Sequence, residues 1–208
     1  MDINNAYNSW ASQYDTNDNK TRDLEALALK KLLSGNRYKH CLELGCGTGK
    51  NTEWLLTICD LITAIDFSQG MLEIAKNKIK SDKVNFSEAD ITKDWTFAKD
   101  IYDLVTFSLM LEHIEDLHAV FQKLSKVTAA GSRVYIGELH PFKQYAGSKA
   151  RFETENGTEV LTCFNHHVTD FIQAANASGY HLIQLEEHFD EGDRTQLPRI
   201  LNLLFEKL

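Results

Sequence analysis

Three glycines at alternate positions form the part of this sequence best suited to hold a ligand. Gly45, Gly47 and Gly49 follow an apolar run and come directly before a helical pattern. Glycine adopts positive φ angles easily and lets the backbone approach a ligand closely. The start of a helix also offers N–H groups that have no partner within the helix. The segment therefore predicts a strand–loop–helix unit that binds a nucleotide-like ligand.

Two common nucleotide-binding motifs do not fit this loop. The dinucleotide fingerprint G-x-G-x-x-G needs glycine where Lys50 stands, which argues against a nicotinamide dehydrogenase. The phosphate-binding motif G-x-x-x-x-G-K-[ST] needs glycine at Leu44 and serine or threonine at Asn51. What remains is an acidic residue, Glu43, two positions before the first of three alternating glycines.

Acidic side chains also end the next two predicted strands. Asp66 ends the second strand, and Asp90 ends the third. In doubly wound sheets ligands bind at the carboxyl ends of the strands. An acidic residue at the position of Asp66 accepts hydrogen bonds from ribose hydroxyls in such sheets. We expect Asp66 to bind a ribose and Asp90 to accept a hydrogen bond from an adenine amino group. Met71 and Ile91 are expected to enclose the adenine ring.

Histidines are the candidates for a general base, because imidazole titrates near neutral pH. His113 follows the fourth predicted strand, His140 follows the fifth, and His166 and His167 precede a helix. The alternative is that His140 only ends a strand and that His166 or His167 caps a helix. We expect at least one of the four to face the substrate. Because their spacing with Glu138 matches no standard zinc pattern, no metal site is predicted.

Short apolar runs alternate with helical patterns from about residue 40 to the end of the chain, which predicts βαβ units and a parallel sheet covered on both faces. Ser68 and Asp116 are expected to cap two of the helices. The expected strands are residues 40–45, 61–67, 84–90, 102–108, 132–139, 181–189 and 200–207. The fold class is therefore α/β, a Rossmann-like doubly wound sheet.

The segments outside this alternation predict two further features. Tyr7, Trp10, Ala11 and Tyr14 share one face of a helix, where Trp10 is expected to pack against the sheet, and a second helix follows through Leu24, Leu27, Ala28 and Leu32. Asn156-Gly157 predicts a hairpin between residues 150 and 164.

The loop from Glu43 to Gly49 resembles motif I of the class I S-adenosylmethionine-dependent methyltransferases, and residues 102–114 resemble motif IV. This resemblance implies a seven-stranded sheet of order 3-2-1-4-5-7-6 with strand 7 antiparallel. The opening segment is similar to the lid of small-molecule methyltransferases, including the ubiquinone/menaquinone C-methyltransferase group, and this implies that Tyr14 closes over the cofactor. Ser108 and the backbone of Gly45–Gly49 are then expected to hold the methionine moiety, with Glu43 bracing the loop. Cys46 and Phe67 complete the expected cofactor site.

The resemblance implies one methyltransferase domain over residues 1–208. Within it we expect a helical lid (1–38), a cofactor-binding core (39–140), a substrate-side insertion (141–167), and a final helix and hairpin (168–208). The residues Ser108-Leu109-Met110-Leu111 stand where enzymes that methylate DNA bases or protein glutamine have an Asn/Asp-Pro-Pro-aromatic element. This lowers the expectation of those substrates.

Charge and composition narrow the partners. The chain has 208 residues and a formal net charge of −8 without a basic block, which argues against nucleic acid as a partner. No stretch is long and apolar enough to predict a membrane span, and four cysteines without a C-x-x-C pair indicate a cytoplasmic protein. Nothing in the sequence predicts an oligomeric state.

The function expected from these features is methyl transfer from S-adenosylmethionine to an O, N or C nucleophile of a small molecule. One alternative is another enzyme that modifies S-adenosylmethionine on the same fold. A second alternative is a non-catalytic protein that binds the cofactor and supports a partner.

Overall fold

Seven strands form one sheet in the computed structural model, which describes residues 3–16, 18–148, 151–154 and 157–208. Their order is β3-β2-β1-β4-β5-β9-β8, and β9 runs antiparallel to both of its neighbours. Counted along the sheet, this is the predicted order 3-2-1-4-5-7-6 with an antiparallel last strand, so the prediction is confirmed. The strands are β1 (Tyr38–Leu44), β2 (Cys59–Asp66), β3 (Val84–Glu88), β4 (Tyr102–Ser108), β5 (Thr128–Leu139), β8 (Tyr180–His188) and β9 (Ile200–Lys207).

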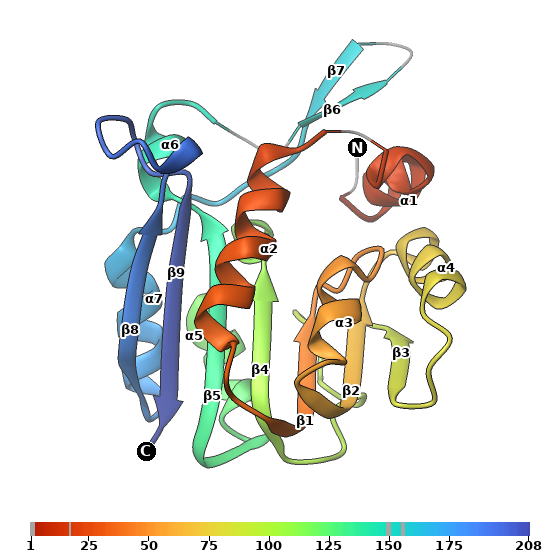
Figure 1. The fold of residues 1–208 in the computed structure, drawn as a ribbon, viewed down its shortest axis with the longest axis vertical. Coiled ribbons are helices and arrows are strands. Elements are labelled where there is room, and N and C mark those ends of the chain that lie inside the picture. The colour runs from red at the N-terminus through yellow and green to blue at the C-terminus, as the bar shows by residue number, and fades with distance from the viewer. Residues whose placement is uncertain (1–2, 17, 149–150, 155–156) are drawn as a thin grey trace.

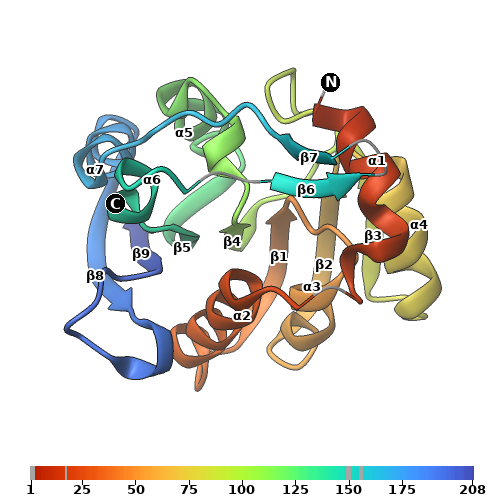
Figure 2. The same cartoon turned by 90° about the horizontal axis from the view of Figure 1, so that it is seen from above.

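The central strands are apolar on both faces because helices cover both sides of the sheet. Alternate residues of β1 show this: Cys41 packs in one hydrophobic cluster, and Leu42 packs in the other. The first cluster holds the buried side chains of α2 (Lys20–Leu33), α3 (Lys50–Leu55) and α4 (Gln69–Lys78). The second holds those of α5 (Leu117–Leu124) and α7 (Val168–Ala177). Figure 2 shows α2 and α3 on one side of the sheet and α5 and α7 on the other.

Two helices begin where the sequence predicts. The Ser68 side chain accepts a hydrogen bond from the Met71 amide at the start of α4, and the Asp116 side chain accepts one from the Ala119 amide at the start of α5. Both caps satisfy amides that have no partner within their helix. The remaining short helices are η1 (Leu111–His113), α6 (Pro141–Tyr145) and η2 (Asp190–Gly192).

The N-terminal helix α1 (Ile3–Tyr14) lies beside α4, above the carboxyl ends of the parallel strands (Figure 1). The Asn8 side-chain oxygen accepts hydrogen bonds from the Ser68 hydroxyl at 2.8 Å and from the Gly70 amide at 2.9 Å. After the helix, the Asp15 carboxylate accepts a hydrogen bond from Thr48 and pairs with Lys78, both at 2.6 Å. Polar contacts therefore fasten α1 to the glycine loop and to α4.

One expectation for the N-terminal helices is wrong. Trp10 packs in a small cluster with Ala6 and Leu161, apart from the two clusters that cover the sheet, because α1 rests on α4.

The predicted second helix is present as α2, which packs on β5 and β9. Ala28 and Leu32 are buried, whereas Leu27 is 63% exposed. The carboxyl side chain of Glu25 is buried on the same helix.

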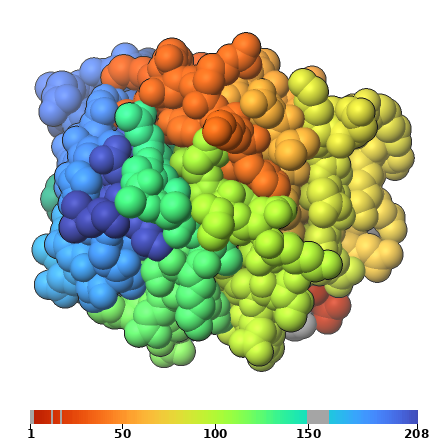
Figure 3. Space-filling view, turned by 90° about the horizontal axis from the view of Figure 1, so that it is seen from below, coloured from red at the N-terminus to blue at the C-terminus, as the bar shows by residue number. Residues whose placement is uncertain are grey.

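The predicted hairpin is present as two antiparallel strands, β6 (Arg151–Thr154) and β7 (Gly157–Val160). Its turn lies outside the described residues. The hairpin stands at the same end of the molecule as α1, above the parallel strands (Figure 1). Figure 3 shows the opposite end, where the last residues of the chain lie beside the loops that precede the parallel strands. Among the helices of the described residues, none has the length and apolar character needed to cross a bilayer.

A buried hydrogen-bond network leaves no room for a side chain at Gly137. A Cβ atom built there would lie 2.5 Å from Glu25 Oε1 and closer still to the Tyr135 hydroxyl. The hydroxyl donates to Glu25 Oε1 at 2.9 Å and accepts a hydrogen bond from the Asn202 side chain at 2.9 Å. We expect Gly137→Ala to lower the free energy of unfolding in urea by about 1–3 kcal/mol. The control is Gly70→Ala in α4, a glycine without a positive φ where the nearest heavy atoms lie 3.3 Å from a Cβ; an equal loss in both variants would contradict the crowding at Gly137.

Candidate active site

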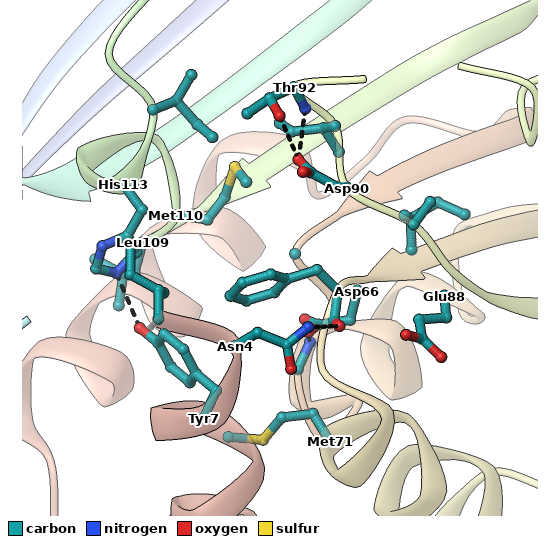
Figure 4. Close-up of a pocket in the computed structure, with 18 of the residues that line it drawn as sticks. Asn4, Tyr7, Asp66, Met71, Glu88, Asp90, Thr92, Leu109, Met110 and His113 are labelled. Atoms are coloured by element: carbon teal, nitrogen blue, oxygen red, sulfur yellow. Dashed lines mark hydrogen bonds between the residues drawn. The ribbon is translucent and has the colours of Figure 1, made fainter. Parts of the chain in front are cut away.

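A cavity of about 460 Å³ opens at the carboxyl ends of β1 to β4, beneath α1 (Figure 4). A volume of this size suits a ligand such as a nucleoside cofactor. It is lined by the following residues of the predicted cofactor site: Tyr14, Gly45, Gly47, Asp66, Phe67, Met71, Asp90, Ile91 and Ser108. Of the four predicted histidines, His113 lines it. The cavity therefore brings together residues from the first 114 positions of the chain.

The glycine loop has positive φ angles at all three glycines, as its composition predicts. Gly45 has a further requirement, because a Cβ atom there would lie 2.9 Å from the Met110 side chain. Gly47 faces the cavity, and its amide donates to Asp66 Oδ2 at 2.8 Å. Gly49 packs against Ala75 of α4 and Ile79 at its C-cap, and does not line the cavity. The third glycine thus fits the loop onto the neighbouring helix.

Asp66 ends β2 and is 8% exposed. Its Oδ1 accepts a hydrogen bond from the Ser68 amide at 2.9 Å, and its Oδ2 accepts the one from Gly47. Burial raises the pKa of Asp66, and the hydrogen bonds from backbone amides oppose that rise. Each carboxylate oxygen retains a second lone pair. The side chain is therefore fixed in orientation and still able to accept hydrogen bonds from the two hydroxyls of a ribose.

Asp90 does not end a strand, contrary to expectation, because β3 stops at Glu88. Asp90 Oδ1 accepts hydrogen bonds from the amide and the hydroxyl of Thr92, so the carboxylate stabilises the turn that follows β3. Both Asp90 and Glu88 line the cavity, and Figure 4 shows their carboxylates on the wall contributed by that segment. Met71 and Ile91 are buried and also contribute to the lining.

Glu43 and Cys46 lie behind the loop and do not line this cavity. Glu43 Oε2 accepts a hydrogen bond from the Thr52 hydroxyl at 2.6 Å, so this side chain connects β1 to α3. Desolvation by burial raises the pKa of Glu43 to about 8. Burial likewise raises the pKa of the Cys46 thiol, which keeps it neutral. Both residues line a smaller neighbouring cavity together with Gly45, Gly47 and Ser108. Glu43 is therefore in a position to brace the loop, and contact of either residue with the cofactor stays a prediction.

His113 and Tyr7 lie next to each other on one wall of the cavity (Figure 4). Its Nε2 lies 3.0 Å from the Tyr7 hydroxyl, and its Nδ1 lies 3.0 Å from the Thr162 carbonyl oxygen. A carbonyl oxygen only accepts, so Nδ1 carries the hydrogen in the neutral ring and Nε2 accepts from Tyr7. Burial raises the pKa of Tyr7 well above its usual value. This side of the cavity therefore presents a neutral phenol and an imidazole nitrogen that is able to accept a proton.

The other three histidines are held by contacts outside the cavity. His140 is 1% exposed, bonds Glu187 through Nε2 at 3.1 Å, and accepts from the Phe142 amide at the start of α6. His166 is buried with Nε2 at 2.7 Å from the Ile114 carbonyl oxygen. His167 precedes α7 and bonds the Tyr145 hydroxyl at 2.5 Å. His140 follows a strand and His167 stands at the N-cap of α7, as the alternative states, whereas His166 caps no helix and is held by the carbonyl oxygen.

Within the part of the chain that the structure describes, no group of three or more His, Cys, Asp or Glu side chains is arranged to hold a metal ion. Glu138, considered with the histidines as a possible ligand, instead accepts hydrogen bonds from the amides of Met110 and Leu111.

Several residues that line the cavity are not predicted from the sequence as site residues. Asn4 and Tyr7 come from α1, and Leu109 and Met110 follow Ser108 directly. Tyr7 lies seven positions before Tyr14, on the same face of the helix, and this spacing was a usable signal. Nothing local distinguishes Leu109 and Met110 from core residues, because their exposure to the cavity depends on how β4 and β1 lie side by side.

Known proteins resemble this chain in sequence. Residues 42–136 match the methyltransferase domain family. An uncharacterized methyltransferase of Emericella nidulans is 26% identical over 86% of this chain and 76% of its own length. A malonyl-[acyl-carrier protein] O-methyltransferase of Priestia megaterium is 29% identical over 87% of this chain and 62% of its own. A demethylmenaquinone methyltransferase of Clavibacter sepedonicus is 35% identical, but over 47% of this chain and 40% of its own. The chain thus spans less than two thirds of the latter two.

Solved structures agree in fold. DhpI in complex with SAH is 25% identical with a TM-score of 0.76, and the match covers 98% of this chain and 94% of that one. The N-methyltransferase NodS of Bradyrhizobium japonicum, at 16% identity and a TM-score of 0.73 over 100% of this chain and 99% of that one, shows the same fold. The fold, the glycine loop and these matches identify the chain as a member of the class I S-adenosylmethionine-dependent methyltransferases, with S-adenosylmethionine as its cofactor. The predicted family, enzyme class and cofactor are confirmed.

The raised pKa of Glu43 has a measurable effect on stability. Between its unfolded value near 4.5 and its folded value of about 8, the folded protein retains a proton that the unfolded chain releases. Its contribution to the free energy of unfolding therefore falls as the pH rises through this window. Glu43→Gln keeps an oxygen for Thr52 and removes the titration, so the fall should be smaller by about 1 kcal/mol per pH unit.

Urea unfolding across this pH window, on both proteins, measures the difference. Glu53→Gln, at an exposed glutamate of α3, is the control and should keep the wild-type slope. A Glu43→Gln variant with the wild-type slope would show that Glu43 does not retain its proton.

Proposed function

We propose that this chain transfers a methyl group from S-adenosylmethionine to an O, N or C nucleophile of a small molecule. The observation that carries the proposal is the single cavity that joins the glycine loop and Asp66 at one side to the His113–Tyr7 pair at the other. The names of relatives add support, since they include malonyl-[acyl-carrier protein], ubiquinone-biosynthesis and demethylmenaquinone methyltransferases. These acceptors differ, so the acceptor of this chain is proposed only as a class.

The lining residues divide into groups that match the parts of the cofactor. Backbone groups of the Gly45–Gly49 loop, together with Ser108 at the end of β4, are proposed to hold the methionine moiety. Asp66 is proposed to accept from the ribose hydroxyls, and Asp90 to accept from the adenine amino group. The apolar side chains around the adenine ring are Phe67, Met71 and Ile91. The cofactor supplies an activated methyl group on a sulfonium.

The helix α1 is proposed to close the cavity over the bound cofactor. Asn4 donates to the Phe67 carbonyl oxygen at 2.9 Å, and Tyr14 lines the cavity with the Arg22 guanidinium 4.1 Å from the centre of its ring. A closed lid excludes water and orients the acceptor, which is the main task of a protein whose cofactor is already reactive. We therefore propose α1 as the part of the predicted lid (1–38) that covers the cofactor, and the division of the chain into lid, core, insertion and final hairpin stays a prediction.

His113 is proposed to accept the proton of the acceptor nucleophile. Its Nδ1–H points to the Thr162 carbonyl oxygen, which holds Nε2 toward the cavity as an acceptor. In the structure the Tyr7 hydroxyl occupies that acceptor position. A substrate hydroxyl or neutral amine that takes the place of Tyr7 would give its proton to Nε2 when its oxygen or nitrogen accepts the methyl group, with S-adenosylhomocysteine as the leaving group. Tyr7, kept neutral by burial, would then bind the substrate by a hydrogen bond.

The compartment and the partners are proposed as the sequence predicts them. No disulfide joins the four cysteines, all of which lie in the described residues, and this supports the proposed cytoplasmic location. The net charge of −8 supports the proposal that the chain does not act on nucleic acid.

Isothermal titration with S-adenosylmethionine and S-adenosylhomocysteine, with NADH and ATP as controls, tests the cofactor site. We expect binding of the two sulfur ligands alone. Asp66→Ala should weaken that binding by about 1–3 kcal/mol, because the ribose hydroxyls lose their acceptor. Asp82→Ala, at an exposed aspartate of the turn before β3, should bind as the wild type does. Equal affinity in Asp66→Ala and wild type would remove Asp66 from the site.

A screen of small hydroxyl, phenol and amine compounds with methyl-labelled cofactor, followed by mass spectrometry of the products, tests the reaction. With an acceptor that reacts, His113→Ala should lower kcat by a factor of about 10²–10⁴ while S-adenosylhomocysteine still binds. His118→Ala, at an exposed histidine of α5, should keep the wild-type kcat. Unchanged kcat in His113→Ala would exclude this histidine as the base, and products other than a methylated acceptor would contradict methyl transfer.

A further inference from the structure

The turn after β4 is held in a conformation that its sequence does not favour. Leu109 has a φ of 53°, in the left-handed region that side chains with a Cβ seldom adopt. Such a residue costs free energy and persists only where the surroundings hold it. Leu109 and Met110 both line the cavity, and η1, which begins at Leu111, carries His113 (Figure 4). The conformation of this turn therefore determines one wall of the proposed active site.

The end of β5 holds three consecutive amides of this turn. The Leu109 amide donates to the Gly137 carbonyl oxygen at 2.8 Å. The amides of Met110 and Leu111 both donate to Oε1 of Glu138, at 3.0 Å and 2.8 Å. Glu138 is 3% exposed, and its Oε2 has no hydrogen-bond partner among the described residues. One oxygen of a buried side chain thus provides two of the three bonds that keep Leu109 in its unfavourable conformation.

The held turn contacts both sides of the site. The Met110 side chain occupies the space where a Cβ of Gly45 would be, and so it packs directly on the glycine loop. The Met110 carbonyl oxygen accepts a hydrogen bond from the His113 amide at 3.1 Å. A shift of this turn would move the support of the glycine loop and the backbone of His113 together.

We infer that Glu138 is a positioning residue that fixes the glycine loop and His113 in the relative position needed for methyl transfer. This inference rests on the proposed function of the cavity. Glu138 does not line the cavity, so it acts through the backbone of Met110 and Leu111.

The surroundings of Glu138 favour a neutral side chain. Desolvation by burial, followed by the nearby Glu112 of η1, raises the pKa of Glu138 to about 8, and Glu25 of α2 acts in the same direction. The strand on its other side, β9, places Leu201 opposite it. Glutamine is therefore a close replacement for the neutral form, because its side-chain oxygen is able to accept the same two amides.

The first test is S-adenosylhomocysteine binding by isothermal titration near neutral pH, which does not require a known acceptor. Glu138→Ala should weaken binding by a factor of about 5–100, the range for buried donors left without a partner. Glu138→Gln should bind within about twofold of wild type, since it still accepts both amides. Glu187→Ala is the matched control: this acidic residue lies in β8 and bonds His140, outside the cavity, and its loss should leave the affinity unchanged.

The pH dependence of binding separates positioning from general destabilisation. Wild-type affinity for S-adenosylhomocysteine should fall as the pH rises through about 8. Burial and the neighbouring Glu112 favour the neutral form of Glu138 in the held arrangement and outweigh the opposing effect of the two amide hydrogen bonds, so ionisation destabilises this arrangement. In Glu138→Gln this fall should be smaller. Urea unfolding of each variant verifies that the proteins titrated are folded. With the acceptor found by the screen, Glu138→Ala should also lower kcat, whereas Glu138→Gln restores it.

The outcomes are distinct for the two proposals. If wild-type protein does not bind S-adenosylhomocysteine, the proposed function of the cavity fails. If wild type binds and a folded Glu138→Ala binds equally well, the cavity stands and the positioning role of Glu138 is wrong. Equal losses in Glu138→Ala and Glu138→Gln would also overturn it, because the second variant keeps the acceptor oxygen.

Discussion

The contact between Met110 and Gly45 is the constraint on which the site depends. Parallel pairing of β1 with β4 brings the loops after these strands side by side, and only a residue without a Cβ leaves space for the Met110 side chain. The same loop donates the Gly47 amide to Asp66 at the end of β2. Three strand ends are therefore joined by one packed contact and by hydrogen bonds of the loop to the end of β2, since the amides of Gly45 and Cys46 also donate to the Ile65 carbonyl oxygen. The cavity is the space that remains above them.

Residues that are far apart in the sequence make the upper wall. The Tyr7–His113 hydrogen bond spans 106 positions, and the Thr48–Asp15 bond spans 33. Such contacts order a terminal segment only when they offset the conformational entropy that the segment loses. The polar contacts of Asn8 and Asp15 with α4 and the loop provide part of this free energy. The remainder comes from a small apolar cluster in which Ala6 of α1 packs with Leu161 and the ring of Trp10.

Carboxyl groups support the site from within the protein as hydrogen-bond acceptors. Glu25, Glu43 and Glu138 are buried, and burial raises the pKa of each. A raised pKa lets a carboxyl remain neutral inside the protein, where an unpaired charge would be costly. Each one binds groups from another element: a tyrosine of β5 and an asparagine of α3, a threonine of α3, and the amides after β4. These acids join the helices and loops to the sheet at the level of the cavity floor.

Features with a local cause were predictable from the sequence. The strands, the helix caps at Ser68 and Asp116 and the positive φ angles of the glycine loop follow from periodicity, capping chemistry and the lack of a Cβ, and each depends on residues close together in the chain. The resemblance added the strand order. The tertiary structure decided three other features: the packing of α1 on α4, the burial of Glu25 on α2, and which of the four histidines, His113, lines the cavity. A histidine next to a strand end shows the same local pattern whether it caps a helix or faces a ligand. The distinction depends on contacts with segments far away in the sequence, such as Tyr7 and Thr162 for His113 and Glu187 for His140.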